Sequence, residues 1–255
     1  MNPATRLSQF KTDLHIHTVL SPCGSLEMSP INIIRTAARK GLDIIGITDH
    51  NSTLHCNVVK QLGKEAGIFV LSGIEITSSE EAHCLAFFEY PQQLIEFQKY
   101  IDDHILKIHN DPDKFGYQVV VDKDENIIGQ VDWLLINATN QSVDQLATKT
   151  HELDGIFIPA HIDRSAYSLT SQLGFVPPEL EADGYEVSKY STPQKMINAY
   201  PWLTNKSFIT SSDAHFLKDI GAVSTLFNIN TRSFLEIKQA LRQSNGRFVK
   251  TLNLL

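Results

Sequence analysis

Two histidines separated by a single residue end a short alternating segment, DLHIHT; they are His15 and His17. Side chains in a β-strand alternate between the two faces with a period of two, so both imidazoles point the same way. Neutral imidazole binds divalent ions such as zinc, manganese and iron, so the pair could hold one ion. An HxH pair alone is more often only the polar face of a strand, and the interpretation depends on further ligands.

Further histidines and carboxylates stand at the ends of other apolar segments. The segments LDIIGITDH, GIFVLSGIEITS, HCLAFFEY, GIFIPAH and SFITSSDAH each read as a buried strand. In a parallel barrel the C-terminal strand ends converge on one face, where active sites are built. Chance rarely places imidazoles and carboxylates at so many strand ends together, so we favour a metal site. The residues of this hypothesis, with six of the ten histidines, are His15, His17, Asp49, His50, Glu75, His83, His161, Asp213 and His215.

The other histidines fall within helical stretches or beside them. They are His55, His104, His109 and His151. We interpret them as solvated helix faces or helix-end charges and place them outside the site.

The order of elements predicts an α/β fold, because apolar strands alternate with segments of helical spacing. Ser29 and Pro30 supply an N-cap and a first-turn proline for a helix that runs to about Lys40. The segment YQVVVDKDENIIG predicts a hairpin that turns over 122–126, and this is the expected insertion. Parallel strands with outer helices follow from the alternation. Further helices are expected over 91–110, 142–153 and 232–242.

Composition limits the class of protein and its partners. With 255 residues, 42% hydrophobic and 20% charged, the chain is typical of a soluble globular protein. The first residues lack the pattern of a secretory signal, and the three cysteines, Cys23, Cys56 and Cys84, do not form a CxxC pair. We therefore expect a cytoplasmic protein with reduced thiols and no membrane span. The net charge of −7 disfavours long duplex DNA as a partner.

At these motifs the chain resembles the PHP family, the polymerase and histidinol phosphatase superfamily of metal-dependent phosphoesterases. The resemblance runs from about residue 12 to residue 221, through DLHIHT, GLDIIGITDHN, GIEIT, EAHCLAFF, IPAHIDRSAYS and SSDAHFLKDIG. It implies a distorted (β/α)7 TIM-like barrel with a small insertion in the middle of the chain, and we expect residues 1–255 to form a single domain.

The resemblance also implies two or three divalent ions, zinc, manganese or iron. It places His15, His17, Glu75 and Asp213 on the first ion, with Glu75 bridging to a second ion held by His83 and His161. A third position would use His50, His215 and a residue of the loop after the first motif. That loop often has an aspartate or histidine after its serine, whereas this chain has SPCGSLE. Its candidates here are Cys23, Ser25 and Glu27.

The resemblance supplies a phosphate ester as substrate, either a small phosphorylated compound or a short nucleic acid. Two neighbouring ions lower the pKa of a shared water, so we expect a metal-bridging hydroxide to attack phosphorus. Arg164, three residues after His161, could hold a phosphate oxygen, and a structural salt bridge is the equally weighted alternative. Asp49 is expected to orient a ligand, and His50 or His215 could protonate the leaving group.

Two other functions stay open. A 5′–3′ exonuclease acting on short oligonucleotides would need the same ions and a wider cleft with stacking aromatic residues, for which Tyr117, Trp133 and Tyr167 are candidates. A non-catalytic metal-binding regulatory module would keep the fold without the chemistry, and only the first loop departs from the motif pattern. The natural substrate, the oligomeric state and the role of residues 91–145 cannot be read from the sequence.

Overall fold

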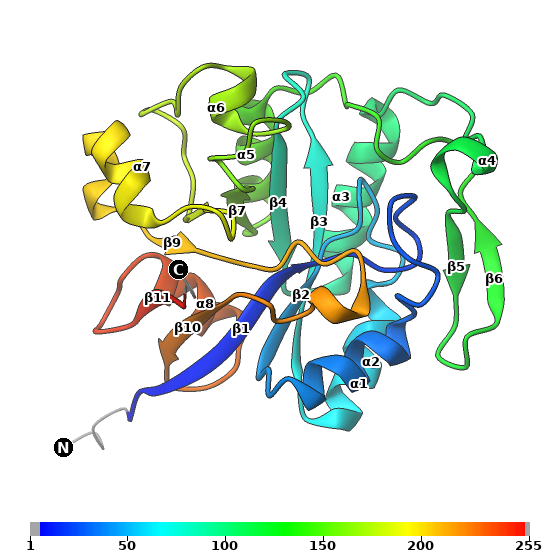
Figure 1. Ribbon diagram of the computed structural model, residues 1–255, viewed down its shortest axis with the longest axis horizontal. Helices are drawn as coiled ribbons and strands as arrows, with labels where there is room; N and C mark the ends of the chain where they lie inside the picture. The colour runs from blue at the N-terminus through cyan, green and yellow to red at the C-terminus, as the bar shows by residue number, and fades with distance from the viewer. Residues whose placement is uncertain (1–5, 253–255) are drawn as a thin grey trace.

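A curled sheet of seven strands forms the centre of the computed structural model, which describes residues 6–252 (Figure 1). The strand order is β11-β10-β1-β2-β3-β4-β7. Two small sheets pair β5 with β6 and β8 with β9. The strands are β1 (Ser8–Ile16), β2 (Ile44–Ile47), β3 (Phe69–Thr77), β4 (His83–Phe88), β5 (Val119–Val121), β6 (Ile127–Gln130), β7 (Ile156–Pro159), β8 (Tyr185–Glu186), β9 (Phe208–Ile209), β10 (Ser224–Ile229) and β11 (Phe248–Leu252).

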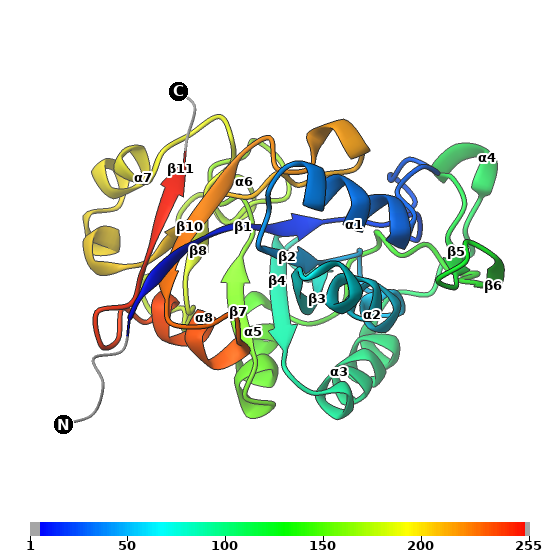
Figure 2. The same cartoon turned by 90° about the horizontal axis from the view of Figure 1, so that it is seen from below.

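Four of the helices, α1, α2, α3 and α5, follow one another in an arc along one side of the sheet (Figure 2). Their apolar faces and the adjoining face of the sheet form the larger hydrophobic cluster. A second cluster fills the other side, where Leu14, Phe87 and Phe227 pack with the apolar residues of α8. The helices are α1 (Pro30–Arg39), α2 (Cys56–Ala66), α3 (Pro91–His104), α4 (Pro112–Phe115), α5 (Val143–Glu152), α6 (Leu169–Gln172), α7 (Pro193–Ala199) and α8 (Phe234–Leu241), with 3-10 turns at Pro201–Asn205 and Leu217–Asp219.

The predicted mixed α/β class is confirmed, but the expectation of parallel strands throughout is wrong. Only the pairs β1–β2 and β2–β3 are parallel within the large sheet. β4 runs antiparallel to β3, because the connection of five residues between Thr77 and His83 is too short for a crossover helix. β4 is also antiparallel to β7. β10 and β11, which are joined through α8, pair antiparallel at the edge beside β1. His83 therefore opens its strand, where the other site residues close theirs.

The helix predictions are mostly confirmed, with one error in length. Ser29 caps α1, and its hydroxyl accepts a hydrogen bond from the Asn32 amide at 3.4 Å. The helix expected over 91–110 ends at His104, because Ile105 adopts an extended conformation and its backbone pairs with Thr139. Residues after α3 thus run extended beside the segment that follows the β5–β6 hairpin.

The hairpin expected for the insertion is confirmed, since β5 and β6 pair antiparallel (Figure 1). Asp122 closes its turn, where one carboxylate oxygen accepts the amides of Asp124 and Asn126, each at 2.9 Å. Val119 and Val121 of the hairpin pack against Val19 in the loop after β1. The insertion therefore supports that loop. Within residues 6–252 no helix is long and apolar enough to cross a membrane.

Candidate metal centre

Glu75 lies at the centre of the cluster, in β3, with 1% of its surface exposed. β3 reaches this point beside the segment after β2, where the backbones of His50 and Glu75 form a parallel bridge. Imidazoles surround its carboxylate on every side. The nitrogen-to-oxygen distances are 3.1 Å from His15, 3.3 Å from His17, 3.0 Å from His50, 2.9 Å from His83 and 3.4 Å from His161.

Asp213 and His215 join the cluster from the segment after β9. The backbone of Ala214 pairs in parallel with Ile16, which carries both side chains to the end of β1. One carboxylate oxygen of Asp213 lies 3.3 Å from His17 Nε2 and 3.5 Å from His15 Nε2. The His215 ring stacks on that of His17, with centroids 4.1 Å apart. Asp213 has a φ of 51°, a conformation that costs free energy outside glycine and gathers at functional sites.

The buried polar atoms and the donor types of the cluster fit metal ions. Both carboxylate oxygens of Glu75 and Nδ1 of His50 are buried and make no aligned hydrogen bond, although other imidazole nitrogens lie close to the carboxylate. A buried carboxylate normally has its hydrogen bonds satisfied, so these unmatched atoms call for a cation. Imidazole with carboxylate is the donor set that zinc, manganese and iron accept. The ligand atoms form three groups, and within each group they lie within 4.8 Å of one another. The groups are His15 with His17 and Asp213, His50 with Glu75 and His83, and His17 with His50 and His215.

Electrostatics divide the imidazoles around the charged Glu75 into two groups. Burial works to lower the pKa of His17 and of His50, but the neighbouring carboxylates outweigh burial and raise both values to about 9. Burial alone would raise the pKa of Glu75, but His83, His15 and His50 outweigh burial and hold that pKa well below its usual range. Burial lowers the pKa of His83 to about 4 and that of His215 to about 3. Both rings are therefore neutral at pH 7, the form that binds a metal ion.

Glu186 is a member of this site that the sequence analysis missed. It lies in β8 with 1% of its surface exposed. One carboxylate oxygen lies 3.0 Å from Nδ1 of His15 and accepts the backbone amide of His161 at 3.0 Å. It therefore orients one imidazole and the backbone of another ligand-bearing segment. The signal was present in the sequence, where GYEVS places an acidic residue within an apolar strand.

Asp49 faces away from the cluster and acts on it through the loop after β1. Its carboxylate accepts hydrogen bonds from the amide of Thr18 and the hydroxyl of Ser21, both at 2.7 Å. The Ser21 hydroxyl in turn lies 3.0 Å from Nδ1 of His17. This geometry supports the predicted orienting role for Asp49 and gives no direct contact with the ligand atoms of the cluster.

The prediction that the four histidines outside the site are solvated or lie at helix ends as charges is wrong for His55. It is fully buried at the start of α2. Its Nε2 accepts the amide of Val121 at 2.9 Å, so Nδ1 carries the proton and donates to the Thr18 hydroxyl at 2.6 Å. The histidine is buried because it links the β5–β6 hairpin to the loop that holds Asp49. Of the remaining three, His104 bonds the Tyr100 carbonyl, His151 bonds Asp183 and His109 is exposed.

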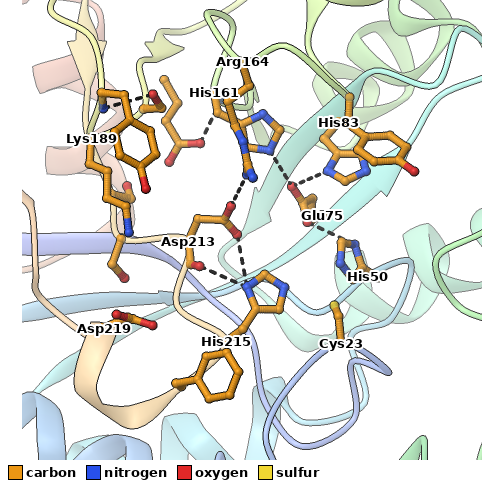
Figure 3. Close-up of a pocket in the computed structure, with 17 residues that line it drawn as sticks. Cys23, His50, Glu75, His83, His161, Arg164, Lys189, Asp213, His215 and Asp219 are labelled. Atoms are coloured by element: carbon orange, nitrogen blue, oxygen red, sulfur yellow. Dashed lines mark hydrogen bonds and ion pairs between the residues drawn. The ribbon is translucent and has the colours of Figure 1, made fainter. Parts of the chain in front are cut away.

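A cavity of about 400 Å³ opens over the cluster (Figure 3). Arg164 lines it and pairs with Asp213 at 2.5 Å, so its guanidinium lies at the predicted face. From the first loop only Cys23 among the three proposed candidates lines the cavity, whereas Ser25 and Glu27 do not. The aromatic and cationic residues of the rim that the sequence analysis did not single out are Lys189, Tyr190 and Phe216.

The three aromatic residues considered for stacking separate into two groups. Tyr167 lines the cavity, and its ring stacks on that of His83 with centroids 4.9 Å apart. Tyr117 and Trp133 belong to the insertion and do not line the cavity. Trp133 instead lies under the amino group of Lys107, 5.0 Å from the ring centre.

The curled sheet with a histidine and carboxylate cluster at the strand ends defines a class of α/β proteins whose strand ends carry side chains that could bind metal ions. The model of the PHP domain family matches residues 13–170, and that of the PHP-associated family matches residues 203–245. The first match covers more than half of the chain. The chain therefore belongs to the PHP family.

Relatives and solved structures agree with this membership. An uncharacterized protein of Methanocaldococcus jannaschii is 40% identical over 79 residues, which are 28% of this chain and 46% of that protein. A phosphoribosyl 1,2-cyclic phosphate 1,2-diphosphodiesterase of Eggerthella lenta is 30% identical over 66 residues, 26% of this chain and 24% of that enzyme. The matches thus span less than half of these curated relatives.

Among solved structures, a lesion-specific endonuclease of Pyrococcus furiosus is similar with a TM-score of 0.69 and 19% identity. The similarity covers 95% of this chain and 58% of the endonuclease. At this identity the comparison shows the fold: a mixed α/β architecture with a half-barrel sheet.

Proposed function

We propose that this chain is a metal-dependent hydrolase of phosphate esters. One observation carries the proposal: a buried glutamate, Glu75, with both oxygens lacking an aligned hydrogen bond among five imidazoles. Divalent ions bound there would polarise the phosphate group and acidify a nucleophilic water. The diphosphodiesterase among the relatives is named for the cleavage of phosphate ester bonds, which supports the same class of reaction.

We assign the ligands to the sets that the family resemblance implies, in which Glu75 would bridge two positions. The first set is His15, His17, Glu75 and Asp213, the second is Glu75, His83 and His161, and the third is His50, His215 and Cys23. The ligand groups of the structure overlap these sets in part, since they place His50 with Glu75 and His83, and His17 with His50 and His215. His50 lies so close to Glu75 that it also reaches the second position. A thiolate from Cys23 would suit zinc better than manganese, since soft ligands favour soft ions.

The remaining site residues act on the substrate or on the ligands. Arg164 stands at the cavity wall, where its planar guanidinium would hold a phosphate oxygen that displaces Asp213 as its partner. His50 or His215 would protonate the leaving oxygen if the third position holds no ion. Asp49 positions His17 through Ser21. A single domain over residues 1–255 and a complete (β/α)7 barrel stay predictions.

Metal analysis joined to a substrate screen tests the proposal. Protein purified without a chelator should carry at least two equivalents of zinc, manganese or iron per chain, because the cluster offers enough ligands for two positions. It should hydrolyse one or more members of a panel of phosphomonoesters, nucleotides and short oligonucleotides. Metal without hydrolysis would instead support the regulatory module, and less than one equivalent after addition of each metal would exclude a metal centre.

A further inference from the structure

We propose that the rim of the cavity binds a nucleobase, so that the substrate is a nucleotide or the terminal nucleotide of a short oligonucleotide. This inference rests on the proposed function and names its substrate class. It follows from three exposed aromatic residues and two cations that line one cavity.

The aromatic residues of the rim are exposed where packing would bury them. Tyr167 is 50% exposed, Phe216 is 50% exposed and Tyr190 is 73% exposed, yet all three line the same cavity. Exposed apolar surface gathered around a cavity is typical of a ligand site. Bases stack on aromatic rings of this kind without a need for hydrogen-bond readout.

The loop that carries Tyr190 is held by its backbone and leaves the ring free. Asp163 accepts hydrogen bonds from the amide and the hydroxyl of Ser188, both at 2.6 Å. The Ser188 hydroxyl accepts the amide of Tyr190 at 3.2 Å. Because these bonds involve no atom of the Tyr190 ring, truncation of the ring should leave the loop in place.

Charge supports a phosphate below the base. Arg164 and Lys189 both line the cavity, and Figure 3 shows them on either side of Asp213. A phosphate bound over the cluster would meet both cations. The ring of Lys189's neighbour, Tyr190, lies 5.4 Å from the lysine amino group, so the phosphate and base subsites adjoin.

The place of Tyr190 at the exposed mouth distinguishes a nucleotide from an aryl phosphate. In an aryl phosphate the ring is bonded directly to the ester oxygen and stays beside the metal ligands. In a nucleotide the ribose separates the base from phosphorus, and the base can reach the mouth. A cavity of about 400 Å³ is within the size range of sites for small ligands.

Competition against hydrolysis of a generic diester, bis(4-nitrophenyl) phosphate, tests the inference on the metal-loaded protein. Inhibition constants are measured for adenosine 5′-phosphate, ribose 5-phosphate and phenyl phosphate. The first should bind about 5- to 150-fold more tightly than ribose 5-phosphate, the factor expected for one stacked base. A dinucleotide that binds more tightly still would assign the end of an oligonucleotide, and equal binding would assign a mononucleotide.

The variants are Tyr190→Ala and Tyr190→Phe, with Tyr117→Ala as the control from an exposed tyrosine outside the cavity. Alanine should bring the ratio of the two inhibition constants toward one, whereas phenylalanine and the control should preserve it. Equal constants in the wild type, or a ratio unchanged in Tyr190→Ala, would overturn the inference. If no ester is hydrolysed the proposed function fails, and calorimetry with the same compounds still decides whether a base is bound.

Discussion

Two regions of the molecule place an aspartate between a histidine and an arginine. At the metal centre Asp213 lies 3.3 Å from His17 and 2.5 Å from Arg164. On another surface, Asp183 lies 3.1 Å from His151 and 3.0 Å from Arg242. The second region even lines a larger cavity, about 800 Å³ against about 400 Å³. Residue types and cavity size alone would therefore choose the wrong site.

The difference lies in how the buried polar atoms are satisfied. Asp183 also accepts the amide of Phe157 at 3.0 Å, and both of its oxygens have partners. Beside Asp213, the two oxygens of Glu75 remain unmatched, and Asp213 itself has a left-handed backbone conformation. A satisfied carboxylate stabilises the fold, whereas unsatisfied carboxylate oxygens beside a strained aspartate indicate a ligand. Four predictions test this distinction.

The largest effect is expected for Glu75→Gln. A neutral amide cannot bridge two cations, so we expect more than about 100-fold weaker metal binding and a comparable loss of hydrolysis. Elemental analysis and steady-state kinetics on the same samples check the result. His109→Ala is the matched control, because His109 is exposed and far from the cluster in the fold. Equal losses in the two variants would show that the assignment of the ligands is wrong.

Glu186→Gln should have the next largest effect. The amide loses the charge that holds Nδ1 of His15 and the amide of His161, so metal affinity should fall about 10- to 100-fold while the ligands themselves remain. Titration of metal-free protein with zinc against a competing chelator measures this affinity. Unchanged affinity would mean that Glu186 only fills space beneath the cluster.

Arg164 and Arg242 give a matched pair of aspartate-bound arginines. Arg164→Ala should lower kcat/KM about 10- to 150-fold with metal content intact, because one charge-assisted phosphate contact is lost. Arg164→Lys should recover part of the loss, since charge survives but the planar geometry does not. Arg242→Ala should leave kcat/KM unchanged. If Arg164→Ala retains wild-type kinetics, Arg164 is a structural partner of Asp213; if it loses metal, it supports the ligands instead.

The sequence predicted the ligands better than it predicted the sheet that carries them. His15 and His17 could be identified because a strand period of two is a local property of the chain. The antiparallel direction of β4 depends on a short connection and on pairing with β7, distant in sequence. The burial of His55 depends on a bond to Val121 in the hairpin, so its position beside α2 suggested only a helix end. Glu186 was missed because its partners lie far away in the sequence.

The smallest effect is expected for Asp183→Asn, which should leave metal binding and hydrolysis unchanged and lower the free energy of unfolding by about 1–3 kcal/mol. Burial works to raise the pKa of Asp183, but the hydrogen bonds from His151 and Phe157 and the charge of Arg242 hold it below its ordinary value of 3.8. A carboxyl with a depressed pKa stabilises the folded protein above its unfolded pKa, and this stability is lost as pH falls through the folded pKa. The difference in the free energy of unfolding between wild type and variant should therefore be largest at pH 7 and should shrink below pH 3.8. Urea unfolding of both proteins across this range measures it. Loss of metal in Asp183→Asn, or a stability difference that grows in acid, would remove the distinction between the satisfied and the unsatisfied carboxylate.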